Sequence, residues 1–382
     1  MRGIVGTLRA TVLAVAVALS VVAGAGCAPP ADRSPVYQPT ADGPAGSAGS
    51  AGPRVRFPWQ PGRPELGVQV YWNDNPDDSP DVVRAKARRV LDYVVGLEAN
   101  AVSIAFPLFT DQLDASLVTT GATTPTPQRL GIVLAEVART GLRTTIRPLI
   151  DEERLTAVDP HAWRGDIEPS NRDEWFASYR SALRPYLALA REQKVSTVIV
   201  ASELSDLEGD PRWQDVVGEA RTEFGGEVTY AYNWDAFVET QVPMPVDRVG
   251  VDAYPILDLG DDATIGQLVA GWNGWLDRRI SGSAPDLIIY EVGAPAEAGL
   301  YLKPSIRHTD GKAVNQVLQA RWFTASCTAA QGRQVAGLYW WKVDFHANLA
   351  DADPLTDRHD SFIGRAAENS IRSCFSSWEG VR

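Results

Sequence analysis

The amino-acid sequence predicts a single (β/α)8 barrel over residues 62–382. Three observations predict this fold. Eight short apolar segments are typical of buried strands, helical or long loop sequence follows each of them, and no glycine-rich phosphate loop follows the first. A doubly wound sheet is the alternative, but it requires such a loop where this chain has Tyr71-Trp72-Asn73-Asp74.

The predicted strands are short, β-branched and apolar at consecutive positions, as expected for strands buried on both faces of a parallel sheet. They are expected at residues 67–71, 101–106, 143–149, 197–201, 228–232, 248–251, 287–290 and 336–340. Between them, four segments carry apolar residues at the 3.6-residue spacing of a helix. The first pattern is formed by Val83, Ala87, Val90, Leu91, Val94 and Leu97, and the second lies in the segment 130–138. The third is formed by Phe176, Tyr179, Leu183, Tyr186, Leu187 and Ala190, and the fourth by Val314, Val317, Leu318 and Trp322.

The composition is that of an ordinary globular protein. Of the 382 residues, 45% are hydrophobic and 22% charged, which excludes a collagen-like, coiled-coil or wholly disordered chain. The formal net charge is −12, whereas a phosphate backbone is bound by clustered Lys and Arg. Nucleic acid is therefore not an expected partner.

The first 61 residues are predicted to lie outside the fold. Residues 1–26 have the order of a bacterial lipoprotein signal, with Arg2 and Arg9 before an apolar stretch and small residues directly before Cys27. Gly24 departs from this pattern, because an aliphatic residue is usual three positions before the cysteine. We expect lipidation of Cys27 and anchoring to the outer face of the cell membrane; secretion or an uncleaved anchor is the alternative. Residues 27–61, rich in Pro, Gly, Ala and Ser, are expected to be a disordered tether.

Cysteine usage agrees with export. Once Cys27 carries lipid, Cys327 and Cys374 remain as a pair, and an even count in an exported protein favours a disulfide over two buried thiols. The three Cys and four His show no zinc-type spacing. We therefore expect no metal and no cofactor.

Chemistry in a barrel lies where the strands end at the carboxyl face. Aromatic, amide and charged residues follow the predicted strands: Tyr71, Trp72, Arg147, Glu203, Asn233, Trp234, Asp252, Tyr254, Glu291, Trp340, Trp341, Lys342 and Asp344. Aromatic rings stack on the C–H faces of sugars, and carboxylates and amides bind hydroxyl groups. This composition predicts a binding site for a polysaccharide or oligosaccharide.

Two glutamates stand out because each ends an apolar strand, where a carboxylate without a function costs desolvation energy. They are Glu203 after the fourth predicted strand and Glu291 after the seventh. Glycoside hydrolysis needs two carboxyl groups, one protonated and one ionised. The alternative is a buried ion pair with Arg147 or Lys342.

Several segments resemble glycoside hydrolase family 113, whose known activity is largely endo-β-1,4-mannanase, within the clan A retaining barrels. They are His161-Ala162-Trp163-Arg164-Gly165-Asp166-Ile167, Glu174-Trp175-Phe176 with Tyr179, Ala201-Ser202-Glu203-Leu204, Thr229-Tyr230-Ala231-Tyr232-Asn233-Trp234, Val249-Gly250-Val251-Asp252-Ala253-Tyr254 and Glu291-Val292-Gly293. The resemblance implies that Glu203 is the acid/base and Glu291 the nucleophile. Tyr254 and Arg147 would keep Glu291 ionised.

The same resemblance and the strand ends together suggest the substrate-binding residues. These are Trp72, His161, Trp163, Asn233, Trp234, Asp252, Trp340 and Trp341. For Tyr254 and the tryptophans the alternative is a place in the core, and His161 is equally suited to cap its loop. Ser202 stands where many clan A enzymes have the Asn that binds the sugar 2-hydroxyl. Residues 292–311 and 345–360 form long loops without an assigned role.

Three functions remain open. The first is a lipid-anchored retaining β-glycosidase acting on an extracellular or cell-envelope glycan, with β-mannan favoured by the resemblance and a galactan or glucan as alternatives. The second is a catalytically silent carbohydrate-binding barrel. The third is a solute-binding lipoprotein, which requires two lobes. The sequence leaves oligomeric state and endo or exo action open.

Overall fold

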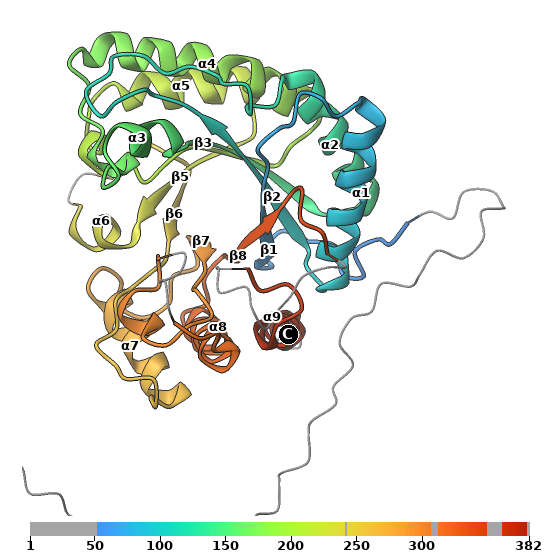
Figure 1. Ribbon diagram of the computed structural model, residues 1–382, viewed down its shortest axis with the longest axis vertical. Helices are drawn as coiled ribbons and strands as arrows, with labels where there is room; N and C mark the ends of the chain where they lie inside the picture. The colour runs from blue at the N-terminus through green and yellow to red at the C-terminus, as the bar shows by residue number, and fades with distance from the viewer. Residues whose placement is uncertain (1–51, 241–242, 307–311, 350–360, 380–382) are drawn as a thin grey trace, which may run out of the picture. The chain divides into compact units, whose positions relative to one another are not determined.

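A computed structural model describes residues 52–240, 243–306, 312–349 and 361–379, and it shows the predicted barrel. Eight parallel strands pair in chain order and β8 closes onto β1; Figure 1 shows them at the centre of the fold. The strands are β1 (Glu65–Tyr71), β2 (Ala101–Leu108), β3 (Arg143–Ile150), β4 (Thr197–Ser202), β5 (Glu227–Asn233), β6 (Arg248–Asp252), β7 (Leu287–Val292) and β8 (Gly337–Asp344). A closed barrel has no second lobe, so the solute-binding hypothesis is wrong.

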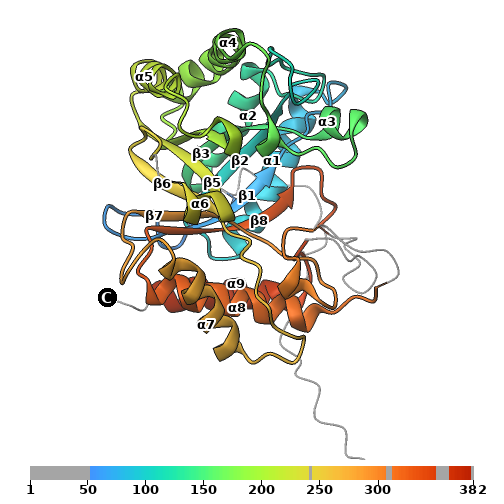
Figure 2. The same cartoon turned by 90° about the vertical axis from the view of Figure 1, so that its left-hand side faces the viewer.

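Helices surround the strands, as Figures 1 and 2 show. They are α1 (Pro80–Gly96), α2 (Pro127–Thr140), α3 (Glu153–Val158), α4 (Arg172–Glu192), α5 (Trp213–Phe224), α6 (Trp234–Glu239), α7 (Ile265–Asp277), α8 (Gln316–Gly332) and α9 (Ala366–Glu379), with 3-10 turns η1 (Arg164–Asp166), η2 (Ser205–Leu207) and η3 (Leu300–Leu302). The four predicted helical patterns correspond to α1, α2, α4 and α8. Val317, expected on the buried stripe of α8, is 56% exposed.

The starts of the main helices are encoded locally. Ser79 caps α1 and Thr126 caps α2, and in both a proline occupies the first helical position. A capping side chain satisfies a backbone N–H that has no partner inside the helix, and proline lacks the N–H that would otherwise be unpaired. Thr264 and Gln267 form a reciprocal capping box at the start of α7.

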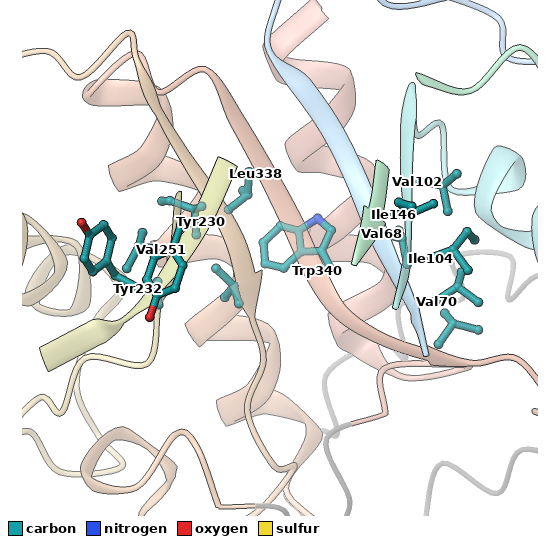
Figure 3. Close-up of a cluster of buried hydrophobic side chains, with 14 of the residues drawn as sticks. Val68, Val70, Val102, Ile104, Ile146, Tyr230, Tyr232, Val251, Leu338 and Trp340 are labelled. Atoms are coloured by element: carbon teal, nitrogen blue, oxygen red, sulfur yellow. The ribbon is translucent and has the colours of Figure 1, made fainter. Parts of the chain in front are cut away.

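Side chains of each strand alternate between the barrel interior and the surrounding helices. Interior residues such as Ile199, Tyr290 and Tyr339 form one buried cluster, and a much larger cluster joins the strands to the helices. Figure 3 shows part of the larger cluster, including Trp340 of β8, Tyr230 and Tyr232 of β5 and aliphatic side chains of other strands. This alternation decides which residue of an adjacent pair faces the barrel axis.

The fold begins earlier than residue 62. The Val55 N–H donates to the carbonyl of Thr140 at 2.9 Å, and the Arg143 guanidinium lies 3.9 Å from the ring centroid of Trp59. Residues 55–61 therefore contact the amino-terminal end of the barrel instead of belonging to the tether. The predicted signal sequence, Cys27 and the remaining tether to residue 51 lie outside the described residues.

A disulfide connects the last two helices. Cys327 of α8 and Cys374 of α9 are bonded, with their Cα atoms 5.9 Å apart, and both are buried. Within the described part of the chain, none of the helices is both long and apolar enough to cross a membrane.

Candidate active site

A cleft of about 370 Å³ opens at the carboxyl ends of the strands. Most of the residues that line it lie near the carboxyl ends of β5, β7 and β8 or on the segments that follow β4, β5, β6 and β7, the end of the barrel where chemistry is expected. The lining residues are Glu152, Trp163, Arg164, Glu203, Asn233, Trp234, Tyr254, Glu291, Pro304, Ser305, Ile306 and Trp341. Both predicted catalytic glutamates thus face one cleft with several predicted sugar-binding residues.

Glu291 contacts a phenol and a guanidinium. Its Oε2 accepts a hydrogen bond of 2.7 Å from the Tyr254 hydroxyl, and its Oε1 lies 2.7 Å from Nη1 of Arg147. Arg147 is fully buried in the barrel, so its charge is poorly screened by water. Burial together with the Glu291 charge raises the pKa of Tyr254, which keeps this phenol a donor. These contacts favour the ionised form of Glu291.

Arg147 also contacts Asp252 and Ser202. Its Nη2 donates to Asp252 Oδ2 at 2.6 Å, and its Nε donates to Ser202 Oγ at 3.0 Å. Asp252 is fully buried and does not line the cleft, so its predicted role in binding sugar hydroxyls is wrong. Asp252 is buried because Arg147 is buried, and a buried guanidinium needs a carboxylate partner. Ser202 is likewise directed at Arg147.

Glu203 lies in a different environment. It occupies a left-handed backbone conformation with φ of +56°, a strained geometry that is found preferentially at functional sites. Its nearest cation is Arg164, whose Nη1 donates to Glu203 Oε2 at 3.4 Å, a long contact. Burial raises the pKa of Glu203 to about 7; Arg164 opposes the shift and the negative charge of Glu291 adds to it. The carboxyl group therefore holds its proton near neutral pH.

The charges around the cleft explain which carboxyl group is protonated. Four carboxyl groups share two guanidinium groups: Asp252 and Glu291 contact Arg147, and Glu152 and Glu203 contact Arg164. With four negative and two positive charges, binding one proton lowers the electrostatic cost. The Glu203 contact is the longest of the four, at 3.4 Å against 2.6, 2.7 and 3.1 Å. Glu203, with the longest contact to a cation, is therefore the carboxyl group lining the cleft that can hold a proton, while burial also raises the pKa of Asp252 behind it.

Two of the predicted sugar-binding tryptophans belong to the core. Trp340 is fully buried and stacks on Phe323 of α8, with ring centroids 4.7 Å apart. Trp72 is also fully buried and stacks on Phe345 at 4.6 Å. Strand alternation is the reason: Trp341 faces the cleft, so its neighbour Trp340 must face the helices. The predictions for Trp72 and Trp340 are wrong.

Three tryptophans remain on the walls of the cleft. Trp163 follows α3, and its Nε1 donates to Asp166 at 2.8 Å while its ring covers Gly165, where a Cβ would lie 2.0 Å from the ring. Trp234 begins α6 and Trp341 lies in β8. All three are half-buried and line the cleft, a placement that suits stacking on sugar rings. Asn233 lines the same cleft, and its Nδ2 donates to Asp235 at 2.6 Å.

His161 does not line the cleft. It is exposed, and its backbone N–H donates to the Asp159 carboxylate at 2.9 Å, so the capping side chain in this turn is that of Asp159. Lys342, the alternative partner for a glutamate, pairs instead with Asp344 at 3.1 Å.

Sequence reasoning missed the charged pair opposite Glu203. Arg164 and Glu152 both line the cleft, although neither follows a strand directly. Arg164 lies inside the segment 161–167 that carries the family resemblance, which was the only signal available. Pro304, Ser305 and Ile306, from the long loop after β7, also line the cleft. Among the described residues, no group of His, Cys, Asp and Glu has an arrangement that would hold a metal ion.

Comparisons with known proteins give one family match and several structural matches. The sequence model of Glycoside Hydrolase Family 113 matches residues 80–362. A solved GH113 beta-1,4-mannanase is 19% identical with a TM-score of 0.66, covering 82% of this chain and 99% of its own. The beta-mannanase from Alicyclobacillus acidocaldarius in complex with ManMIm is 20% identical with a TM-score of 0.66, covering 83% and 98%.

A more distant likeness has the same fold. A GH5_18 protein from Streptomyces cattleya in complex with GlcNAc is 14% identical with a TM-score of 0.51, covering 84% of this chain and 82% of its own. No curated protein matches the sequence. At these identities the solved structures bear on the fold, whereas the family match extends over most of the described chain.

Proposed function

Because the chain belongs to Glycoside Hydrolase Family 113, and is therefore a glycoside hydrolase, we propose that it cleaves a β-mannan-like polysaccharide with retention of anomeric configuration. The observation that carries the mechanism is the contrast between its two glutamates. Glu291 touches a buried guanidinium and a phenol, whereas Glu203 has one long contact with a cation. One carboxylate is thus ionised while the other is protonated, as double displacement requires.

In the first step, a carboxylate oxygen of Glu291 attacks the anomeric carbon and the bond to the leaving oxygen breaks. Glu203 transfers its proton to that oxygen, so the leaving group departs as a neutral alcohol. In the second step, Glu203, now ionised, removes a proton from water, and the resulting hydroxide displaces Glu291. Two inversions at the same carbon give net retention.

The neighbours of Glu291 support its role as nucleophile. A nucleophile must be ionised before it attacks, and Arg147 stabilises that state through its charge and Tyr254 through its hydrogen bond. When the covalent bond forms, the negative charge on Glu291 is lost. Arg147 then remains paired with Asp252, so the buried guanidinium is never left without a carboxylate.

Two observations favour a mannan-like substrate. The family neighbours with solved structures are beta-mannanases by their own titles, and the cleft combines aromatic walls with charged and amide groups. Trp163, Trp234 and Trp341 are proposed to stack on sugar rings, and Asn233 to bind a hydroxyl group. The carbohydrate polymer would be bound across the carboxyl face of the barrel.

The test is hydrolysis of β-1,4-mannan, β-galactan and β-glucan together with aryl β-glycosides, with the anomer of the first product followed by proton NMR. The β-anomer from mannan is expected. Glu291→Ala should abolish turnover, and Glu203→Ala should retain activity only on aryl glycosides with good leaving groups. Near-normal turnover by Glu291→Ala would refute the nucleophile assignment, and an α-anomer would refute retention. Sugar binding without hydrolysis would favour the silent barrel.

We also propose that the enzyme is exported and anchored to the outer face of the membrane by lipid on Cys27. The signal-like order of residues 1–26 and the composition of the tether support this proposal. Metabolic labelling with palmitate should label the wild-type protein and not Cys27→Ser. An unlabelled wild-type protein in the soluble fraction would contradict the proposal.

A further inference from the structure

The guanidinium of Arg164 bridges two carboxyl groups of the cleft. Its Nη2 lies 3.1 Å from Oε1 of Glu152, and its Nη1 lies 3.4 Å from Oε2 of Glu203. The Arg164 backbone N–H also donates to Oε1 of Glu152 at 3.4 Å. Glu152 thus has two contacts with Arg164 and the shorter ion pair, so the cation is drawn mainly toward Glu152.

The loop around Arg164 holds it in that place. Arg164 begins the 3-10 turn η1, whose preceding residue Trp163 is tied to Asp166 by a hydrogen bond of 2.8 Å. The Trp163 ring covers Gly165 so closely that no side chain fits there. These contacts fix the backbone at Arg164, so the position of the guanidinium depends on its two carboxyl partners.

A cation beside a catalytic acid opposes its function. A guanidinium stabilises the carboxylate form, and the acid must deliver a proton. A second carboxylate that binds the same guanidinium weakens this effect in two ways. It holds the cation at a greater distance, and its own negative charge raises the cost of ionising the acid.

We propose that Glu152 is a positioning residue that draws Arg164 away from Glu203, so that Glu203 keeps the proton it delivers to the leaving group. The proposal rests on the acid role proposed above for Glu203. It assigns a function to a residue on the loop after β3, on the opposite side of Arg164 from the acid.

Four charged groups have the largest effects on the pKa of Glu203, and Asp252 also interacts with it. Arg164 and Arg147 lower its pKa, and Glu291 and Glu152 raise it. Arg147 already forms ion pairs with Asp252 at 2.6 Å and with Glu291 at 2.7 Å. Arg164 is therefore the cation whose effect on the pKa of Glu203 can change, and Glu152 is the other carboxyl group that it contacts. Neutralising Glu152 and removing Arg164 should then act on Glu203 in opposite directions.

The experiment is the pH dependence of kcat/KM on a mannan oligosaccharide for the wild type, Glu152→Gln and Arg164→Met. The descending alkaline limb reports deprotonation of the acid in the free enzyme. Glu152→Gln should move this limb down by about one pH unit, a tenfold change in proton concentration, and Arg164→Met should move it up. Glu168→Gln is the matched control, because Glu168 is 73% exposed and pairs with Arg172 outside the cleft.

A second measurement is independent of activity. Carbon-13 NMR of Cδ-labelled glutamate reads the titration of Glu203 directly, with its signal assigned by Glu203→Gln. A limb or titration that stays in place or moves up in Glu152→Gln would overturn the inference, as would a downward shift in Arg164→Met. If the NMR shift is found in a protein without hydrolase activity, the coupling stands and the proposed function fails.

Discussion

The Tyr254 hydroxyl, on the segment after β6, donates a 2.7 Å hydrogen bond to Glu291, which lies near the carboxyl end of the neighbouring strand β7. The same carboxylate contacts Arg147 through its other oxygen. The two oxygens of Glu291 are therefore oriented by a guanidinium from β3 and by a phenol from the segment after β6. A carboxylate fixed in this way loses little conformational freedom when it attacks a substrate.

Removing the phenol should slow catalysis without unfolding the protein. Tyr254→Phe deletes one hydrogen bond to a charged acceptor, worth about 1.5–3 kcal/mol, so kcat should fall by about 10- to 100-fold. Steady-state kinetics and thermal unfolding measured on the same preparation test this. An unchanged kcat would show that Arg147 alone orients Glu291.

The raised pKa of Glu203 lowers the free energy of unfolding at pH values above the ordinary pKa of a glutamate. The folded value is about 7 against an ordinary 4.5, so between these values the unfolded state releases a proton that the native state retains. Stability therefore falls as pH rises through this window, by about 3 kcal/mol at most. Glu203→Gln should lose less stability than the wild type between pH 5 and pH 8. Equal losses in chemical denaturation at the two pH values would refute the shift.

Adjacent tryptophans of β8 should behave in opposite ways. Trp341→Ala removes an aromatic wall of the cleft and should raise KM with little change in the unfolding temperature. Trp340→Ala leaves a cavity against Phe323 and should destabilise the fold by about 3–5 kcal/mol. Denaturant unfolding and KM determined for both variants decide the matter, and a stable Trp340→Ala protein with a raised KM would reverse the assignment.

The disulfide should contribute to stability and leave catalysis unaffected. Cys327 and Cys374 close a loop with a sequence separation of 47, for which loop entropy predicts about 4 kcal/mol. The double variant Cys327→Ala with Cys374→Ala should unfold at a lower temperature, and reduction of the wild type should give a similar change. A large loss of kcat in the folded double variant would contradict a purely structural role.

The first described residues should stabilise the barrel. Trp59→Ala removes the ring under Arg143 and should cost about 1–2 kcal/mol, read as a lower unfolding temperature with unchanged kinetics. Phe57→Ala is a suitable control because Phe57 is 50% exposed. Equal unfolding temperatures for Trp59→Ala and the wild type would place the boundary of the fold near residue 62 after all.

The sequence by itself determined the barrel. All eight predicted strands lie within observed strands apart from Ala336, which immediately precedes β8. The strands could be predicted because apolar, β-branched runs and helical spacing are local patterns, and burial of apolar side chains away from water favours them along the whole chain. The sequence also placed Glu203 and Glu291 at strand ends on one face. Parallel strands in chain order bring such ends together regardless of detail.

Only the tertiary structure decided which side chains face the cleft. Register shifts at β4/β5, β6/β7 and β7/β8 interrupt strict alternation at the very ends that carry Glu203, Asp252 and Glu291. Residues near these shifts cannot be assigned to a face from the sequence, which is why the role predicted for Asp252 was wrong. The prediction for Trp340 was wrong because the sequence does not show which of the two adjacent tryptophans of β8 faces the cleft. The contact between Arg164 and Glu152 joins two loop segments, and its geometry depends on packing that no local pattern encodes.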